Sequence, residues 1–382
     1  MDKTKEVLFA HQSAIPHYRI PFYNALERLR PAHWRFDVVF DPSEVTKHRF
    51  FHEPLDVNQF HFSTVNVNTY SFRLAGKIIS YQTFWRKAGK YDLVIVENAV
   101  NNLTYPLCQL HRFHHTRVAY WGHGKDRSAE KPSSLKSLAE KLKIYLVHRS
   151  DGFFAYTQGV KTYLEKQGVP PDNIFVSYNT IDINEQRGYF TQWSAKKQEI
   201  KQEIGIFEKN VLLFVGRFTR NKRIGFLLES FSILRKMDPD FRLLFVGSGK
   251  ELPKDNLPEN VSWLGPIIDL NKLAPIYVAS DVFVFPGAVG LGPLQAMCYD
   301  LPAITIDASN HMPEIEYLTP MNSIILETAT TPAQYANTIL SLFQENTRLD
   351  ALKASTWTSI QNLTVDQMAR NFIMGINSIL GL

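Results

Sequence analysis

Cysteine is almost absent from this chain of 382 residues, which contains only Cys108 and Cys298. Two cysteines are too few for a disulfide framework, and they lack the paired spacing of a zinc site. The sequence also contains no run of about 18 apolar residues, so no membrane-spanning helix is expected. Its charged start leads into only four apolar residues, Val7 to Ala10, which is unlike a secretion signal. We therefore expect a cytoplasmic protein that could at most lie on the inner face of the cytoplasmic membrane.

The net charge is also low, because 42 Lys and Arg are nearly balanced by 37 Asp and Glu, which leaves +5. This excess is small for the length, and the basic residues do not alternate with aromatic ones, so nucleic acid is not an expected partner. Hydrophobic residues make up 45% and charged residues 21%, as in folded globular proteins. The length exceeds that of a typical single domain, which predicts two domains with separate cores.

Much of the positive charge lies between Lys125 and Arg149, where leucines recur at helical spacing. These leucines are Leu135, Leu138, Leu142 and Leu146. A solvated helix whose apolar stripe faces the core would have this pattern. A helix attracted to an anionic membrane surface would have it as well. Both interpretations stay open at the level of the sequence.

Short apolar runs alternate with helical patterns along the whole chain, which is typical of α/β proteins with parallel sheets. The expected strands of the first half are Val7–Ala10, Phe36–Phe40, Leu93–Val96, Val118–Trp121, Phe153–Tyr156 and Ile174–Ser177. Those of the second half are Val211–Val215, Arg242–Val246, Val261–Leu264, Val282–Phe285 and Ala303–Ile306. Two Rossmann-like domains in tandem predict ligand binding at the carboxyl ends of their strands, in a cleft between the domains.

The domain boundaries follow from the same pattern. The expected domains are residues 1–180 and 181–362, followed by a C-terminal helix within 363–382. The polar stretch from Tyr178 to Lys209, rich in Lys and Glu, is interpreted as the linker. Apolar residues between Val365 and Ile379 form one face of the C-terminal helix, and Thr364 with Gln367 matches a capping box. This helix is free to pack back on either domain, for instance on the N-terminal one.

The segment from Val211 to Arg223 combines a buried strand with a cluster of cations. The strand ends at Gly216, and four cations follow within seven residues, among them Arg217 and Lys222. Such a loop attracts anions through its side-chain charge and through the unpaired amides at the start of the next helix. A diphosphate is the expected ligand, with cations that are merely solvated as the alternative.

A glycine-rich loop follows another strand of the second half. Gly287, Gly290 and Gly292 lie between that strand and the next helix. Without side chains in the way, the amides from Val289 through Leu291 to Gly292 can approach a phosphate or a sugar closely. Alone, this loop could be an ordinary strand-to-helix turn. Together with the cationic loop, it predicts an anion site.

These two segments resemble the retaining glycosyltransferases of the GT-B fold, the group 1 family that includes bacterial lipopolysaccharide and mannosyl transferases. Gly216-Arg217 with Lys222 is similar to the family's diphosphate clamp. Gly247 matches its second glycine turn, and Glu314 stands before an isoleucine as in the family. The resemblance covers the second half of the chain well and the first half at a few points. It implies that these residues bind a nucleotide-sugar donor.

In the first half, Trp121-Gly-His-Gly124 lies where the family often carries its active-site histidine, so the resemblance implies that His123 positions the donor sugar. His11 and Ser13 follow the first expected strand and would face the acceptor side. The N-terminal domain would then bind the acceptor and the C-terminal domain the donor. The implied reaction transfers a sugar from a nucleotide-diphosphate sugar to a hydroxyl of a glycan or lipid-linked glycan. It would retain the anomeric configuration and serve the synthesis of polysaccharide or lipopolysaccharide.

Neither a metal nor another cofactor is expected, because Arg217 and Lys222 would stabilise the leaving diphosphate as a divalent metal does in other transferases. One departure from the family concerns its usual pair of Glu residues, which are replaced here by Gly287 and Gln295. The first Glu normally contacts sugar hydroxyls, and the second holds the ribose, a role that the amide of Gln295 could still fill. The change leaves two alternatives open, a non-catalytic GT-B protein that binds a nucleotide sugar or glycan, and a nucleotide-sugar epimerase.

Overall fold

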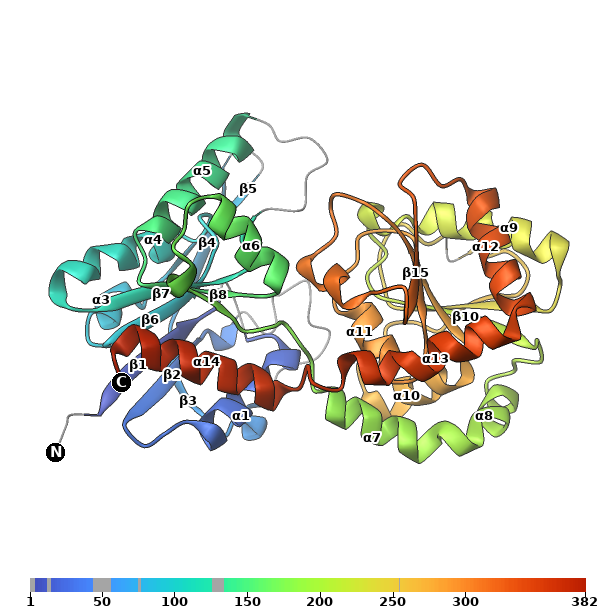
Figure 1. Ribbon diagram of the computed structural model, residues 1–382, viewed down its shortest axis with the longest axis horizontal. Coiled ribbons are helices and arrows are strands. Elements are labelled where there is room, and N and C mark those ends of the chain that lie inside the picture. The colour runs from blue at the N-terminus through green and yellow to red at the C-terminus, as the bar shows by residue number, and fades with distance from the viewer. Residues whose placement is uncertain (1–3, 12–14, 44–55, 75–76, 126–133, 254) are drawn as a thin grey trace. The chain divides into compact units, whose positions relative to one another are not determined.

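The structure of the protein, a computed structural model, describes residues 4–11, 15–43, 56–74, 77–125, 134–253 and 255–382. Its internal contacts divide the chain into two compact units. The first unit comprises Met1–Asp182 together with Leu363–Leu382, and the second comprises Ile183–Asn362. The last helix of the chain therefore belongs to the first unit, as its red ribbon beside the blue N-terminal elements shows (Figure 1).

The first unit is built on a seven-stranded sheet with the order β3-β2-β1-β6-β7-β8-β9, in which all neighbouring strands are parallel. The strands are β1 (Lys5–Ala10), β2 (Trp34–Phe40), β3 (Ser63–Asn66), β6 (Leu93–Glu97), β7 (Arg117–Gly122), β8 (Gly152–Ala155) and β9 (Ile174–Val176). The central strands read as continuous apolar runs because helices cover both faces of the sheet. An antiparallel hairpin of β4 (Thr69–Leu74) and β5 (Lys77–Gln82) stands beside it.

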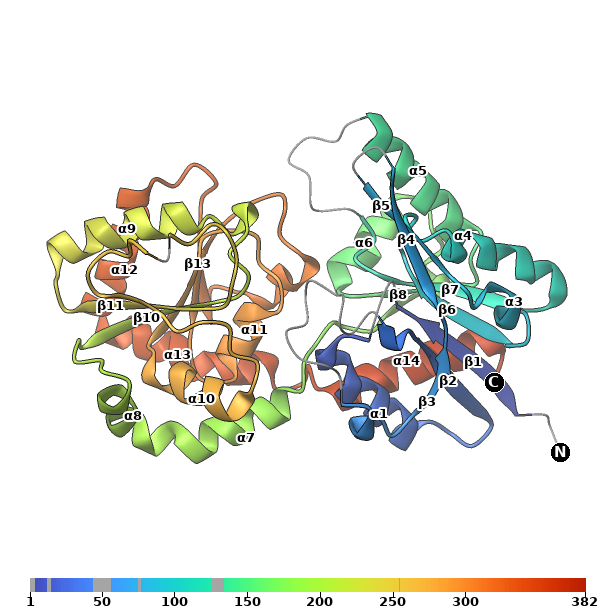
Figure 2. The same ribbon diagram turned by 180° about the vertical axis from the view of Figure 1, so that it is seen from behind.

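Helices α1 and α14 lie on one face of this sheet, and α4, α5 and α6 lie on the other (Figures 1 and 2). The helices are α1 (Ile20–Leu29), α3 (Trp85–Ala88), α4 (Thr104–Cys108), α5 (Ser134–His148), α6 (Gln158–Lys166) and α14 (Val365–Leu380). Thr364 caps α14 by accepting a hydrogen bond from the amide of Gln367. The ring of Phe372 stacks on that of Phe154 in β8, with 4.4 Å between ring centroids. The C-terminal helix thus supplies part of the core of the first unit.

The second unit repeats this design with a six-stranded parallel sheet in the order β12-β11-β10-β13-β14-β15. Its strands are β10 (Asn210–Val215), β11 (Phe241–Val246), β12 (Val261–Trp263), β13 (Val282–Phe285), β14 (Ala303–Ile306) and β15 (Ser323–Leu326). Its helices are α7 (Ile183–Trp193), α8 (Lys197–Glu203), α9 (Ile224–Met237), α10 (Leu270–Ala279), α11 (Gly292–Met297), α12 (Pro332–Gln344) and α13 (Asn346–Ile360). The predicted α/β class with two Rossmann-like parallel sheets is confirmed.

Both sheets reverse the direction in which strands are added at one point, between β1 and β6 and between β10 and β13. Loops that follow such neighbouring strands diverge, and the crevice between them at the carboxyl edge is where ligands bind in open α/β sheets. In the second unit these loops are the cationic loop after β10 and the glycine loop after β13. The topology therefore brings the two predicted anion-binding segments together.

Two expectations about the chain between and within the units were wrong. The stretch from Tyr178 to Lys209 is no simple linker, because most of it forms α7 and α8, which pack on α10 of the second unit. The sequence pattern also missed the short strands β3 and β15 and both strands of the hairpin, of which β4 is largely exposed. Among the described residues, no helix is both long and apolar enough to cross a membrane.

Candidate active site

The cationic loop after β10 is fixed by the loop after β11. The amide of Gly216 donates to the carbonyl of Val246 at 2.9 Å, and the amide of Phe218 donates to the carbonyl of Ser248 at 2.8 Å. Gly247 has a φ of +135°, and a β-carbon at this position would overlap the carbonyl oxygen of Gly216. Gly247 therefore acts by letting two backbone segments touch, and it holds the start of the cationic loop in place.

The glycine loop after β13 is pressed against the same cationic loop. The amide of Ala288 donates to the carbonyl of Asn221 at 2.8 Å, and the ammonium group of Lys222 donates back to the carbonyl of Ala288. A β-carbon on Gly287 would lie 2.5 Å from the α-carbon of Lys222. The glycine at the position of the family's first Glu thus has a steric cause in this chain, because no side chain fits there. On the other side of the loop, the position of Gly292 lies close to the end of β10.

Lys222 carries its charge in an unfavourable place. The pKa of Lys222 is lowered to about 8, chiefly by burial and also by the positive charge of Arg217, while the carboxylate of Glu314 acts in the opposite direction. The ammonium group of Lys222 lies 4.7 Å from the ring centroid of Phe285. Arg217 is exposed, and its partial desolvation lowers its pKa, although a guanidinium stays charged at physiological pH. Two adjacent cations beside one buried carboxylate leave a surplus of positive charge that an anion would neutralise.

His311 holds the centre of the glycine loop. The amide of Val289 donates to Nδ1 of His311 at 2.9 Å, and Nε2 of His311 lies 2.9 Å from the carbonyl oxygen of Ile306. These partners assign the imidazole as neutral with its proton on Nε2. The Val289 amide was expected to contact the donor, but it is hydrogen-bonded to His311. The amides that could contact the donor are therefore those of Gly290, Leu291 and Gly292. These three find no acceptor among the described residues.

Two further predicted donor residues lie in the same unit. Glu314 is 3% exposed and belongs to a short 3-10 helix, Pro313–Tyr317. Gln295, on α11, uses its amide nitrogen to donate to Gln186 on α7 at 3.2 Å. Gln295 is therefore partly committed to the packing of α7 against α11. Neither Gln186 nor His311 could be found from the sequence, because each acts through a contact between distant segments.

The predicted residues of the first unit lie at the carboxyl edge of its own sheet. His123 is exposed just after β7, and its ring lies 4.6 Å from that of Tyr156, which follows β8. His11, after β1, is 2% exposed and has both nitrogens occupied, Nδ1 by Glu97 at 2.9 Å and Nε2 by Tyr23 at 2.6 Å. It therefore does not present a free nitrogen to an acceptor, contrary to expectation. Ser13 lies outside the described residues.

A buried arginine that the sequence pattern did not indicate lies under this edge. Arg19 is 1% exposed, donates to Tyr156 at 3.2 Å, and has its guanidinium 4.5 Å from the ring centroid of Trp121. It also donates to Asn179 and to the sulfur of Met368 on α14.

Among the described residues, no group of three or more His, Cys, Asp or Glu could hold a metal ion.

The two doubly wound sheets, with a cationic loop and a glycine loop at one switch point, define the class of GT-B glycosyltransferases. Two family models match this chain, "Glycosyltransferase Family 4" over residues 22–185 and "Glycosyl transferases group 1" over residues 209–345. The chain therefore contains the domains of these two glycosyltransferase families, one in each half.

The chain is also similar to individual proteins and solved structures. Spore coat protein SA of Bacillus subtilis is 25% identical over 219 residues, which are 51% of this chain and 56% of that protein. Mannosylfructose-phosphate synthase of Agrobacterium fabrum is 28% identical over 134 residues, 30% of this chain and 29% of that protein. The chain thus spans about half or less of the length of these curated relatives. HepE of Anabaena in complex with UDP superposes with a TM-score of 0.71 at 14% identity, over 98% of this chain and 100% of HepE. Another structure of HepE contains UDP-glucose.

Proposed function

We propose that the protein transfers a sugar from a nucleotide-diphosphate sugar, such as a UDP sugar, to a hydroxyl of a glycan or lipid-linked glycan. The observation that carries this proposal is the pair of adjacent cations, Arg217 and Lys222, next to the free amides of the glycine loop. The burial of Lys222 and its repulsion by Arg217 oppose its own charge, which indicates a site prepared for an anionic ligand. The complexes of HepE with UDP and UDP-glucose support UDP as the nucleotide.

In the reaction, the bond between the anomeric carbon and the β-phosphate oxygen breaks, and a bond to the acceptor oxygen forms. Negative charge builds on the departing diphosphate, where Arg217, Lys222 and the amides of Gly290 to Gly292 would stabilise it without reorganisation. The proton of the acceptor hydroxyl passes to the departing phosphate, and the configuration is retained, as the resemblance to the family implies. These protein cations would take the part that a divalent metal takes in other transferases, so the proposed reaction needs none.

The proposal is tested by replacing each cation. Lys222→Ala or Arg217→Ala is expected to weaken binding of UDP by roughly ten- to a hundredfold, because each loses charge-assisted hydrogen bonds of about 1.5–3 kcal/mol. The matched control is Arg220→Ala, which removes an exposed cation of the same loop. Isothermal titration calorimetry with UDP and GDP measures the affinities. UDP and GDP affinities that are unchanged in Lys222→Ala would show that the donor binds elsewhere.

A non-catalytic role is favoured by one observation, the steric exclusion of any side chain at Gly287, which removes the family's contact to the sugar hydroxyls. A pure binder would hold a nucleotide sugar without cleaving it. Slow hydrolysis of UDP sugars by the wild type, lost in Lys222→Ala, separates the transferase from such a binder. Conversion of one UDP sugar into another without release of UDP would instead indicate an epimerase.

Two leucines of α5 support a membrane-associated acceptor. Leu138 is 64% and Leu142 is 43% exposed, whereas Leu146 of the same stripe is buried. The α5 stripe therefore faces the core at one end and solvent at the other. We expect Leu138→Glu with Leu142→Glu to reduce co-sedimentation with phosphatidylglycerol vesicles. Phe207→Glu, at an 85% exposed apolar residue of the second unit, is the control.

A further inference from the structure

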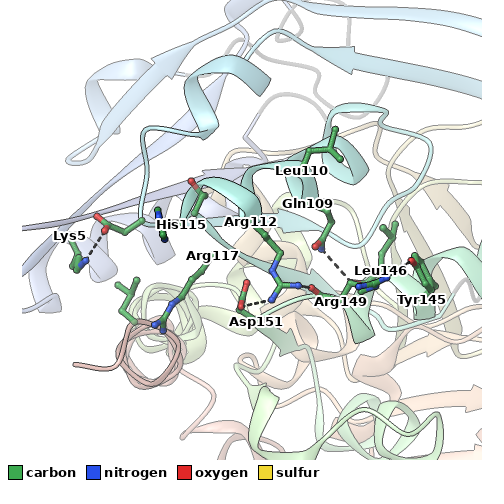
Figure 3. A pocket seen from close by; sticks show the side chains of 13 residues that line it. Lys5, Gln109, Leu110, Arg112, His115, Arg117, Tyr145, Leu146, Arg149 and Asp151 are labelled. Atoms are coloured by element: carbon green, nitrogen blue, oxygen red, sulfur yellow. Dashed lines mark hydrogen bonds and ion pairs between the residues drawn. The ribbon is translucent and has the colours of Figure 1, made fainter.

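A cavity of about 750 Å³ in the first unit is lined by ion pairs that have a structural role (Figure 3). Lys5 pairs with Asp92 at 2.8 Å, and Arg112 pairs with Asp151 at 2.9 Å. Each of the two carboxylates also accepts a hydrogen bond from a backbone amide of a neighbouring strand. These pairs fix the beginnings of strands, and no ligand is needed to explain them.

A polar cluster of the second unit, in contrast, reaches the candidate donor site. It contains Gln295, which stands where the family carries its ribose-binding Glu. The amide nitrogen of Gln295 donates to Oε1 of Gln186 at 3.2 Å, and the hydroxyl of Tyr299 donates to the same oxygen at 2.8 Å. Gln186 is 5% exposed and Tyr299 is 2% exposed. The three side chains come from α7, from α11 and from the segment directly after α11, so the cluster lies wholly within one unit.

Tyr299 is the fixed end of this cluster. Its ring stacks on that of Tyr277 in α10, with 4.7 Å between centroids and 10° between the ring planes, and meets Phe190 of α7 edge-on. Burial raises the pKa of Tyr299, so its hydroxyl keeps its proton at neutral pH. Among the described residues, Oε1 of Gln186 is the one acceptor for this proton.

The single acceptor of Tyr299 sets the orientation of both amides. If the amide of Gln186 were turned over, its nitrogen would face Tyr299, and the buried hydroxyl would have no acceptor for its proton. With Oε1 of Gln186 in this place, Gln295 has to present its amide nitrogen, because two amide oxygens cannot hydrogen-bond to each other. The oxygen of Gln295 is then the end of its amide that accepts no hydrogen bond from the described residues.

Gln295 lies one turn away from the glycine loop. It follows Gly292 by three residues on α11, and residues at this spacing are neighbours on one face of a helix. Gly292 supplies one of the loop amides that we propose to bind the diphosphate. In a nucleoside diphosphate the ribose is joined directly to the diphosphate, and the ribose hydroxyls are hydrogen-bond donors. A ribose hydroxyl is therefore the natural partner for the oxygen of Gln295.

We infer that Gln186, held by Tyr299, is a positioning residue that occupies the amide nitrogen of Gln295, so that the amide oxygen accepts a hydrogen bond from a ribose hydroxyl. The inference rests on the proposed donor site. A Glu at position 295, as in the family, would place a second acceptor against Oε1 of Gln186. The cluster thus accounts for the glutamine in this chain, and a neutral amide takes the part of a carboxylate in recognising ribose.

Calorimetry on the full chain with UDP, 2′-deoxy-UDP, 3′-deoxy-UDP and inorganic pyrophosphate tests this role. The wild type is expected to bind at least one deoxy analogue about three- to tenfold more weakly than UDP, the loss expected for one neutral hydrogen bond. Gln186→Leu frees the amide of Gln295 to turn, so this preference should be largely lost while the affinity for pyrophosphate is unchanged. Gln186→Glu keeps an acceptor for both donors and should restore the preference. Gln202→Leu, at an exposed glutamine of α8, is the matched control and should keep it.

Thermal unfolding of the free protein tests the orientation of the amides without a ligand. Gln295→Glu should lower the melting temperature, because either two oxygens face each other or Gln186 turns and leaves the hydroxyl of Tyr299 without an acceptor. In a Tyr299→Phe background the amide of Gln186 can turn without this loss. The same replacement should then lower the melting temperature much less, and equal losses in both backgrounds would overturn the inference.

The binding outcomes separate this inference from the proposed function. UDP that binds no more tightly than either deoxy analogue, or a preference that survives Gln186→Leu, would overturn the role of Gln186 and leave the donor site intact. A wild type that does not bind UDP would overturn both. Lys222→Ala should weaken the binding of UDP and of both analogues equally, because it removes a contact to the diphosphate that all three share.

Discussion

Raising the pH from about 7 to about 9 is expected to weaken UDP binding, because Lys222 loses its proton with a pKa of about 8. The cationic form binds the diphosphate, and the bound diphosphate in turn keeps Lys222 protonated. The free protein then has to regain a proton on binding, and the lysine is about one-tenth protonated one pH unit above its pKa. The affinity should therefore fall by about tenfold, or ~1.4 kcal/mol.

Calorimetry with UDP across this pH range measures the effect. Lys222→Arg is the informative variant, because a guanidinium keeps its charge and should remove the pH dependence. Arg220→Ala should keep it. An affinity in the wild type that is flat over the range, or an equal slope in Lys222→Arg, would refute the assignment of a depressed lysine pKa at the diphosphate site.

Three substitutions test how the structure is held together, each by urea unfolding beside a matched control. Gly287→Ala should destabilise the second unit by about 1–3 kcal/mol through overlap with the backbone of Lys222, whereas Gly290→Ala meets no atom within 4 Å and should be close to neutral. His311→Ala should lower the free energy of unfolding by about 1–3 kcal/mol and raise the KM for the UDP sugar, because the Val289 amide loses its acceptor. His148→Ala, which removes an exposed hydrogen bond of the first unit, should leave KM unchanged. Phe372→Ala should lower the free energy of unfolding by about 3–5 kcal/mol, because it leaves a cavity beside Phe154. Met374→Ala, at a residue of the same helix that is 61% exposed, should have little effect. Equal losses in a variant and its control would contradict the contact concerned.

The sequence predicted those parts of the fold that depend on local patterns. Central strands such as β10 and β13 are continuous apolar runs because they are buried on both faces, so their positions could be read directly. The pattern failed at α7 and α8, whose many polar residues resemble a solvated connection although Ile183 and Ile200 are buried. It failed as well at β4 of the hairpin, where exposed residues follow one another.

For the candidate site, position along the strands was the informative signal. Arg217, Lys222 and Gly287 were found because they follow strands, and the strand order brings their loops together. The sequence could not show why residue 287 is a glycine, because the cause is the close contact of its backbone with that of Asn221 and Lys222. His311 was missed for the same kind of reason, because its partners Val289 and Ile306 come together only in the folded chain.

The placement of α14 has a consequence for how the protein is made. A ribosome releases residues 1–182 first, yet the aromatic layer around Phe154 is covered by Phe372, which is synthesised after the entire second unit. The first unit is therefore translated first but completes its fold last. The first unit keeps an apolar face of its sheet uncovered until α14 has been synthesised. The second unit can complete its folding before that point.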